Sequence, residues 1–181
     1  MLRSMSEELF DIVNERDEVV GRASRREIHR LGLKHRSVHV LVFSARGWLF
    51  LQKRSAAKDR HPGRWDSSAS GHVDAGEDYD GAASRELQEE LGLAAPLERL
   101  FKIPAGPATE QEFVWVYRCE AEGPFRLAPA EIERGDWFAP EAVCRWIAEQ
   151  PGDFASTFPL AWRRWLEWDG RKSGDAGGRC G

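Results

Sequence analysis

Three glutamates, Glu86, Glu89 and Glu90, lie within five consecutive residues of a stretch whose composition favours a helix. At 3.6 residues per turn their side chains would fall within an arc of about 100°. Carboxylates gathered on one strip repel one another unless a cation lies between them. Hard divalent ions such as Mg²⁺ take oxygen ligands and often share them with substrate phosphates. The strip therefore predicts a Mg²⁺ site for phosphate chemistry, and a solvated acidic helix face is the alternative.

The residues around the strip define the helix that would carry it. Asp78 and Asp80 place negative charge in the first turn, where the helix dipole favours it. Gly92 stands where a left-handed cap would end the helix. A glycine-containing polar loop, residues 71–76, precedes it. We therefore expect a loop followed by a helix over residues 78–91 that packs on a sheet.

The stretch from residue 71 to residue 93 resembles, at every fixed position, the signature of the Nudix hydrolases. Nine constrained positions at fixed spacing make this resemblance specific. The matching residues are Gly71, Glu77, Arg85, Glu86, Leu87, Glu89, Glu90, Gly92 and Leu93. The resemblance implies an α/β/α sandwich with a mixed sheet, and divalent metal held by the three glutamates of the strip. It also implies a structural ion pair between Glu77 and Arg85, so we do not count Glu77 as a ligand.

The rest of the chain alternates between strand-like and helix-like segments, as this α/β fold requires. Strands are expected over residues 9–13, 18–21, 38–43, 48–52, 67–70, 97–103, 112–119 and 134–138. Further helices are expected over residues 25–31, 140–149 and 158–168. Residues 53–65 form a long basic loop of the kind that is often functional. We expect one Nudix domain over residues 1–168 and a disordered Gly-rich tail over residues 169–181.

The composition of the chain argues against several classes of binding partner and cellular location. A net charge of −4 argues against general affinity for nucleic acid or membranes. No apolar run reaches the roughly 18 residues of a membrane helix, and the N-terminus lacks the apolar segment of a signal peptide. Three cysteines without metal or redox spacing fit a reducing cytosol. We expect a cytoplasmic enzyme with a small-molecule diphosphate as partner, and the sequence leaves monomer and homodimer open.

Segments outside the Nudix signature resemble the type I isopentenyl-diphosphate isomerases, a branch of the same superfamily. They are residues 11–15, 20–21, 33–36, 52–55, 58–59, 62–65 and 71–72. In those isomerases three histidines and a Glu-x-Glu pair hold a divalent metal. His35 and His72 stand at two matching places and His29 is near the third. Glu110 and Glu112 match the glutamate pair, so the resemblance implies a second metal site, which histidine and carboxylate suit. Surface histidines in loops are the alternative.

Two basic residues of the long loop, Arg54 and Lys58, match isomerase positions that contact the diphosphate. The chemistry agrees, because Arg grips phosphate oxygens in a fork and Lys adds a point charge. A solvated basic loop is the alternative. Four aromatic residues are candidates for stacking on a base or covering a prenyl chain, although core packing is the stronger expectation for most of them. They are Trp65, Phe101, Trp115 and Tyr117.

Two departures from the isomerases decide the expected activity. The isomerases use a cysteine for proton transfer where this chain has Ser70, and a serine hydroxyl is a far weaker acid than a tuned thiol. They also typically carry a basic residue where this chain has Glu86. The sequence therefore predicts a hydrolase built on an isomerase-like body.

The expected reaction is hydrolysis of a diphosphate linkage, with Mg²⁺ as cofactor and Mn²⁺ as a possible substitute. A carboxylate would take a proton from the attacking water, and the candidates are Glu86, Glu89 and Glu112. The alternative, isomerase activity, would account for the isomerase-like segments but not for Ser70 or Glu86. A non-catalytic nucleotide-sensing module is the third alternative, and the complete signature argues against it. The group attached to the diphosphate is not readable from the sequence.

Overall fold

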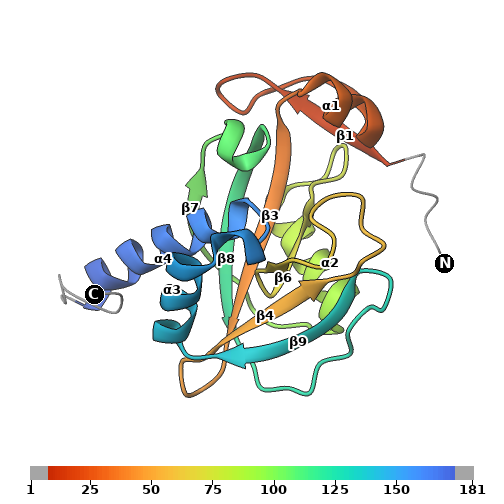
Figure 1. Ribbon diagram of the computed structural model, residues 1–181. Coiled ribbons are helices and arrows are strands. Elements are labelled where there is room, and N and C mark those ends of the chain that lie inside the picture. Colours follow the sequence, from red (N-terminus) through yellow and green to blue (C-terminus); the bar gives the residue numbers. More distant parts are fainter. Residues whose placement is uncertain (1–7, 174–181) are drawn as a thin grey trace.

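A mixed β-sheet forms the centre of the molecule (Figure 1). The computed structural model describes residues 8–173. The strands are β1 (Leu9–Val13), β2 (Val19–Ser24), β3 (His35–Phe43), β4 (Leu49–Arg54), β5 (Trp65–Asp66), β6 (Ala69–His72), β7 (Glu98–Ile103), β8 (Glu112–Glu120) and β9 (Ile132–Phe138). The helices are α1 (Arg25–Leu31), α2 (Tyr79–Leu91), α3 (Pro140–Glu149) and α4 (Thr157–Ser173), with short 3₁₀ turns at Pro107–Thr109 and Pro151–Asp153.

The strand order of the central sheet is β5-β4-β3-β8-β7, with β6 also paired to β3 and β9 to β4. β3 and β8 run parallel over their whole length, from the pair His35–Glu112 to the pair Phe43–Glu120. β6 pairs antiparallel with the first half of β3. The sequence of β3 is dense in β-branched and apolar residues, which suits a strand buried on both faces.

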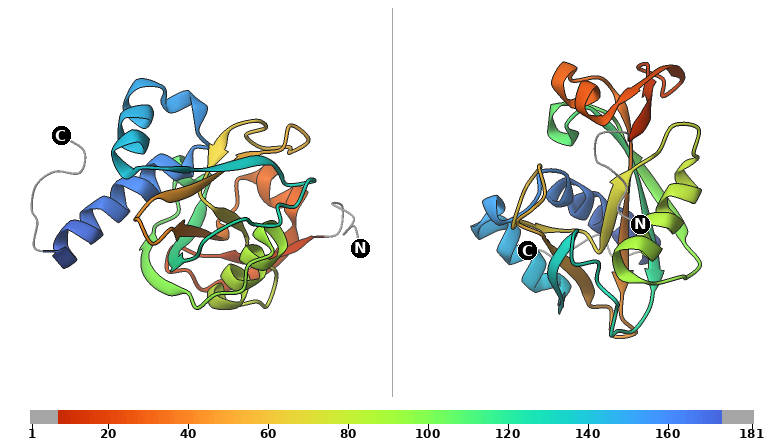
Figure 2. Two further views of the ribbon diagram at one scale, coloured as in Figure 1. Left: turned by 90° about the horizontal axis from the view of Figure 1, so that it is seen from below. Right: turned by 90° about the vertical axis from the view of Figure 1, so that its right-hand side faces the viewer.

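Helices cover both faces of this sheet, which makes three layers (Figure 2). Because side chains alternate along a strand, Val38, Val40 and Val42 of β3 face α2, where they meet Ala83 and Leu87. Leu41 and Phe43 point to the opposite face and pack with side chains of α3 and α4, Phe158, Trp162, Trp165 and Val143 among them. The α/β/α sandwich expected from the sequence is confirmed.

The β1–β2 hairpin and α1 lie together at one end of the sheet (Figure 1). A small core of Phe10, Ala23 and Ile28 holds them to each other. Asp17, in the hairpin turn, ties this unit to the main sheet. Its side chain accepts hydrogen bonds from Arg36 Nε at 2.6 Å and Tyr79 OH at 2.8 Å.

Local sequence signals predicted the observed bounds of several helices. α1 and α3 are confirmed residue for residue, and Gly32 and Gly92 end α1 and α2 in the left-handed conformation. Other bounds were wrong. β3 begins three residues before the expected start, and β6 lies two residues later than expected.

The last helix, α4, continues through the Gly170 segment that was expected to begin the disordered tail. The remainder of that tail, residues 174–181, lies outside the described residues. No helix within residues 8–173 has the length and apolarity needed to cross a membrane.

Candidate metal centre and active site

Local interactions at both ends fix the helix that carries the glutamates. The Asp78 side chain caps the start of α2 by accepting a hydrogen bond from Gly81 N at 2.7 Å. Gly92 ends the helix in the left-handed conformation with φ of 64°, close to the 62° of Gly32 at the end of α1. It donates its N–H to Gln88 O at 3.0 Å. Leu87 and Leu91 pack into the core, so the neighbouring glutamate strip is turned towards β6.

Two of the three glutamates lie against β6, where Glu90 is buried and the Glu86 side chain is 13% exposed. The carboxylate of Glu90, a residue 4% exposed, accepts hydrogen bonds from Gln52 Nε2 at 2.6 Å and Ser70 N at 3.1 Å. The carboxylate of Glu86 lies against Gly71, where a β-carbon would come within 2.2 Å of it. Gly71 is therefore required for this close approach, which gives a physical reason for a glycine at the start of the signature.

Arg85 neutralises part of the acidic strip. Its guanidinium donates to Glu77 at 2.9 and 2.8 Å, so the expected structural ion pair is confirmed. It also contacts Glu86 Oε1 at 2.6 Å and Glu89 Oε2 at 3.4 Å. Unlike its two neighbours, Glu89 is open to solvent, with a side chain 58% exposed. Solvent exposure therefore differs along the strip: Glu86 and Glu90 are largely shielded, whereas Glu89 is accessible.

The electrostatics of the buried pair favour a cation. Burial raises the pKa of Glu86 to about 7, against the lowering effect of Arg85. Burial, and then the neighbouring Glu86, raise the pKa of Glu90 well above its usual range. Two buried carboxylates this close resist ionising together without added positive charge. The donor set therefore fits a hard divalent cation such as Mg²⁺.

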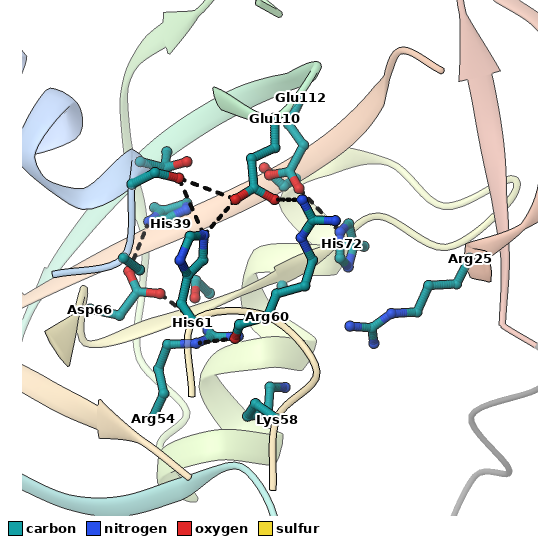
Figure 3. A pocket seen from close by; sticks show the side chains of 16 residues that line it. Arg25, His39, Arg54, Lys58, Arg60, His61, Asp66, His72, Glu110 and Glu112 are labelled. Carbon is teal, nitrogen blue, oxygen red and sulfur yellow. Dashed lines mark hydrogen bonds and ion pairs between the residues drawn. The ribbon is translucent and has the colours of Figure 1, made fainter. Parts of the chain in front are cut away.

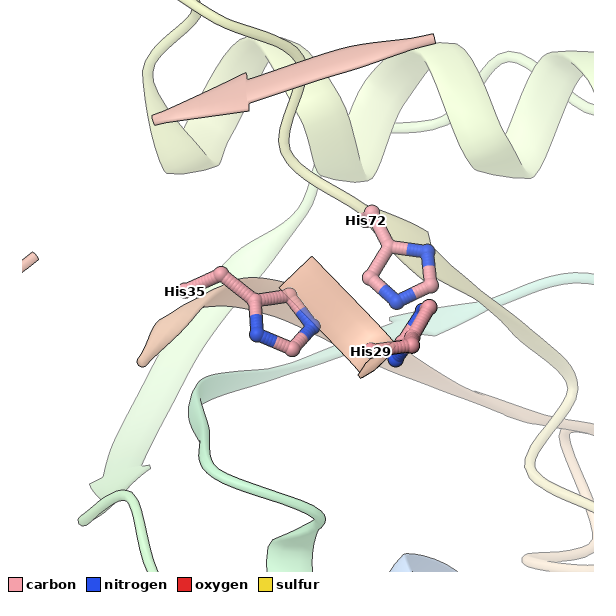
Figure 4. A group of neighbouring side chains, drawn as sticks. All are labelled: His29, His35 and His72. Carbon is pink, nitrogen blue, oxygen red and sulfur yellow. The ribbon is translucent and has the colours of Figure 1, made fainter. Parts of the chain in front are cut away.

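A second cluster lies beside the first. His29, His35 and His72 each offer a ring nitrogen, and these nitrogens all lie within 4.8 Å of one another (Figure 4). The three residues come from α1, β3 and β6. Glu112 at the start of β8 completes the cluster, because its Oε1 lies 3.2 Å from His72 Nε2 and 3.4 Å from His35 Nε2. His29, the weakest of the three sequence matches, thus lies with the other two.

The hydrogen bonds of this cluster leave two ring nitrogens available to a cation. His35 Nδ1 lies 2.9 Å from Leu33 O, so Nδ1 carries the proton and Nε2 presents a lone pair. That lone pair faces Glu112 without a hydrogen-bond partner among the described residues, and His29 Nε2 is likewise buried and unpartnered. Two acceptors meeting in a buried site call for a cation between them. The histidine and carboxylate donors fit a transition metal or Mn²⁺.

The ionisation states of Glu112 and His29 also suit a metal site. Burial would raise the pKa of Glu112, but the neighbouring imidazoles of His35 and His72 hold it well below its usual range. Burial, together with the charges of His72 and His35, lowers the pKa of His29 to about 4. Glu112 is therefore ionised and His29 neutral near pH 7, the forms in which both bind metals.

Glu110, expected to ligate metal beside Glu112, contacts other residues. Its carboxylate pairs with Arg60 and lies 2.5 Å from His61 Nε2. The reason is the backbone, because Glu110 and Gln111 have φ of 54° and 69° and the chain between the two glutamates is not extended. The Glu-x-Glu spacing therefore does not bring both carboxylates to the histidines.

The loop between β4 and β5 borders a pocket that His72 and Glu112 of the second cluster also line (Figure 3). Gly71, which the Glu86 carboxylate contacts, is in its wall as well. Arg54 and Lys58, expected to contact the diphosphate, both line it. Arg54 donates to Asp66 Oδ2 at 3.1 Å, and Lys58 pairs with Glu131. Lys58 also lies close enough to lower the pKa of Glu86 and of Glu90. Lys58 therefore couples this pocket electrostatically to the acidic strip.

Ser70 lines the pocket at the place of the isomerase cysteine, and its amide rather than its hydroxyl binds Glu90. The candidate stacking aromatics lie elsewhere. Trp65 and Tyr117 are buried in the cores, and Phe101 and Trp115 pack against them. Sequence reasoning missed Gln52, the hydrogen-bond donor to Glu90, and His39, which lines the pocket. His39 continues the alternation His35-x-Ser37-x-His39, a signal that was available in the sequence.

Comparisons with known proteins agree with this site. The family model described as "NUDIX domain" matches residues 33–158. The chain is 34% identical to the uncharacterized Nudix hydrolase YfcD of Escherichia coli K12, over 78% of this chain and 79% of that protein. It is 34% identical to an isopentenyl-diphosphate Δ-isomerase of Serratia proteamaculans, over 72% of this chain and 76% of that protein.

Among solved structures, DR0079 from Deinococcus radiodurans superposes with a TM-score of 0.78 at 31% identity, covering 87% of this chain and 98% of that one. The fold, the sequence signature and the relatives thus all indicate the same family. In this chain α2 is the helix that carries Glu86, Glu89 and Glu90. The chain belongs to the Nudix family and is a Nudix hydrolase.

Proposed function

We propose that this chain is a divalent-metal-dependent hydrolase that cleaves the diphosphate linkage of a nucleoside diphosphate derivative or a similar organic diphosphate. The observation that carries the proposal is the buried pair Glu86 and Glu90, held against β6 beside the pocket that Lys58 lines. Two carboxylates with raised pKa values next to a basic pocket suit a site that gathers a cation and a phosphate together.

Mg²⁺, or Mn²⁺ in its place, would be held by Glu86, Glu89 and Glu90 and would supply charge neutralisation on the phosphate oxygens. The remaining work falls to the protein. Arg54 and Lys58 orient the diphosphate from the pocket wall. The Glu112 side chain is 13% exposed and contacts His72 Nε2 at 3.2 Å, so its carboxylate is held in position at the pocket.

The base that takes the proton from water is one of Glu86, Glu89 and Glu112. Each is a carboxylate at or beside the pocket, and they differ in surroundings. Glu89 is accessible to solvent, whereas Glu86 is partly neutralised by Arg85 and Glu112 by two histidines. Separate replacement of each by glutamine, assayed over a range of Mg²⁺ concentrations, distinguishes them, because excess metal restores part of the turnover after loss of a ligand but not after loss of the base.

The test is release of phosphate or pyrophosphate over a panel of nucleoside di- and triphosphates, dinucleotides, nucleotide sugars and prenyl diphosphates, with Mg²⁺ and with Mn²⁺. Glu89→Gln and Glu90→Gln are expected to abolish turnover while the circular dichroism spectrum stays that of the wild type. Glu149→Gln, at the exposed end of α3, is the matched control. Full activity in both site variants would contradict the proposal.

The second candidate function is isomerisation of isopentenyl diphosphate. The observation in its favour is the cluster of His29, His35 and His72 with Glu112, together with the isomerase of Serratia proteamaculans among the relatives. Ser70 argues against it, because its hydroxyl has no base as a hydrogen-bond partner among the described residues. Deuterium uptake from D₂O into isopentenyl diphosphate, lost in His72→Ala or Glu112→Gln, would support it. Absence of uptake under conditions that support phosphate release would exclude it.

A further inference from the structure

The Glu110 carboxylate lies among hydrogen-bond donors in the wall of the pocket. Its Oε2 pairs with Arg60 Nη2, and its Oε1 lies 2.5 Å from His61 Nε2 and 3.3 Å from Ser156 Oγ. Figure 3 shows this carboxylate next to Arg60 and His61, in the same pocket as Lys58. The contact therefore brings together three separate segments, which are the β4–β5 loop, the turn before β8 and the residue before α4.

The three partners of this carboxylate form a donor set that suits a phosphate. A hydrogen bond from His61 lowers the pKa of Glu110, so its carboxyl group is ionised near pH 7 and only accepts hydrogen bonds. The imidazole N–H, the serine hydroxyl and the guanidinium are therefore all donors. Phosphate oxygens are bound by the same groups, and arginine holds them with charge-assisted hydrogen bonds. The side chain of Glu110 thus occupies a site whose donors also fit an external anion.

The pair of His61 and Glu110 is held with an unfavourable backbone conformation on both sides. The two residues have φ of 48° and 54°, in the left-handed region that residues other than glycine rarely adopt. Such conformations are costly and persist only where the surroundings enforce them. Release of the contact would let both segments relax, which offsets part of the hydrogen bonding that is lost.

A diphosphate bound at Lys58 would meet the Glu110 carboxylate. Lys58 and Arg60 are two positions apart in the β4–β5 loop, a spacing that spans at most about 7 Å of chain, and both side chains line the pocket. Two negative groups drawn to one arginine repel each other, and the repulsion is stronger in a partly buried site than in water. The carboxylate and the diphosphate therefore compete for Arg60, and the diphosphate carries the larger charge.

We propose that Arg60, His61 and Ser156 form an anion subsite that the Glu110 carboxylate closes from within, and that a phosphate group opens it by replacing this carboxylate. The inference rests on the proposed function, since the expected phosphate group is that of the diphosphate substrate. Glu110 is then an autoinhibitory contact, which keeps weakly charged anions out of the subsite. This role differs from the metal ligation that the Glu-x-Glu spacing predicted.

The test is isothermal titration calorimetry of the full chain with Mg²⁺. The probes are methylenediphosphonate, a diphosphate analogue whose bridge does not hydrolyse, and inorganic phosphate. Glu110→Gln removes the charge and keeps the size of the side chain, so it should bind methylenediphosphonate about 10-fold tighter than the wild type. Glu133→Gln is the matched control and leaves affinity unchanged, because the Glu133 carboxylate pairs with Lys53 outside the pocket. Unchanged binding by Glu110→Gln, or the weaker binding expected after loss of a metal ligand, would overturn the proposal.

Further variants assign the gain to the subsite. In the Glu110→Gln background, Arg60→Ala should remove the gain and Ser156→Ala should reduce it about 2- to 5-fold, because each lacks one donor. Ser156 is exposed, so its replacement leaves the core intact. A gain that persists in full without Arg60 would refute the assignment.

A crystal structure of the wild type with methylenediphosphonate gives a direct readout. A phosphonate oxygen is expected within hydrogen-bond distance of Arg60 and His61, with the Glu110 carboxylate turned away. A carboxylate that still pairs with Arg60 in that complex would overturn the proposal.

The two probes distinguish a diphosphate from free phosphate as the anion. A gain confined to methylenediphosphonate assigns the subsite to a diphosphate that also reaches Lys58, and an equal gain by inorganic phosphate assigns it to a single phosphate group. Both results support the subsite.

Failure of the proposed function gives a different result. If the panel of phosphate compounds shows no metal-dependent release while Glu110→Gln still tightens binding, the anion subsite stands and the hydrolase proposal falls. If release occurs but Glu110→Gln has the affinity of the wild type, the hydrolase proposal stands and the anion subsite falls.

Discussion

Gly71→Ala is the sharpest perturbation that this structure offers, because one methyl group meets the carboxylate of Glu86. A β-carbon at Gly71 would lie 2.2 Å from the Glu86 carboxyl carbon and from Oε1, and 2.6 Å from Oε2. Ordinary contact begins near 3.4 Å, so the carboxylate must retreat by about 1.2 Å. The obstructing group is the end of a flexible side chain, which can turn away without moving the backbone.

The two consequences differ in size. Stability should fall by only about 1 kcal/mol, which corresponds to losing the hydrogen bond between Glu86 and Arg85. Activity should fall far more, because a displacement of about 1 Å at a reacting centre can reduce the rate 100-fold. We therefore expect Gly71→Ala to lower kcat/KM about 100-fold in a protein that still folds.

The assay is Mg²⁺-dependent phosphate release, with urea unfolding of the same preparations. Gly152→Ala is the matched control, since a β-carbon there meets no atom within 4 Å. If Gly71→Ala acts through Glu86, adding Glu86→Gln should cause little further loss. Wild-type kcat/KM in Gly71→Ala, or fully additive losses in the double variant, would refute the reasoning.

Three further predictions concern charge. Lys58→Ala should raise KM about 10-fold in the phosphate-release assay, whereas Lys53→Ala, whose Nζ pairs with Glu133 at 3.0 Å outside the pocket, should leave KM unchanged. His35→Ala should remove the visible absorption of bound Co²⁺ expected from the histidine cluster, while Glu149→Gln retains it. Asp17→Asn should lower the free energy of unfolding at pH 7 by about 1–3 kcal/mol in urea titrations. Burial would raise the pKa of Asp17, but bonds from Lys102, Arg36 and Tyr79 lower it. The difference between wild type and Asp17→Asn should therefore be complete above the unfolded pKa of about 4 and close as the pH falls through the lower folded value.

Features set by neighbouring residues could be predicted from the sequence. The bounds of α1 and α2 follow from caps such as Ser24, Asp78 and Gly92, which act within a few residues, and α3 begins with Pro140 in its first turn. The glutamate strip and the Glu77–Arg85 pair depend on helical spacing, which is equally local.

Features set by distant contacts could not be predicted. His29 joins the second cluster because α1 packs against the hairpin, which no local spacing encodes. Glu110 does not join that cluster, because Glu110 and Gln111 adopt positive φ, a conformation that their residue types do not require. His39 was expected only as a member of the strand over residues 38–43 and Ser37 lay outside it, whereas the fold places both beside β6 at the pocket. The cytoplasmic location, the oligomeric state and the domain bounds stay predictions.

Strand β6 supplies consecutive residues to different partners. The Ser70 amide binds Glu90, Gly71 receives Glu86, and His72 joins the imidazoles. Sliding this segment by one position along β3 would exchange its two faces and misassign all three roles at once. Insertion or deletion of a residue here should thus be far less tolerated than substitution on either side, because one shift displaces parts of both the acidic and the imidazole centres.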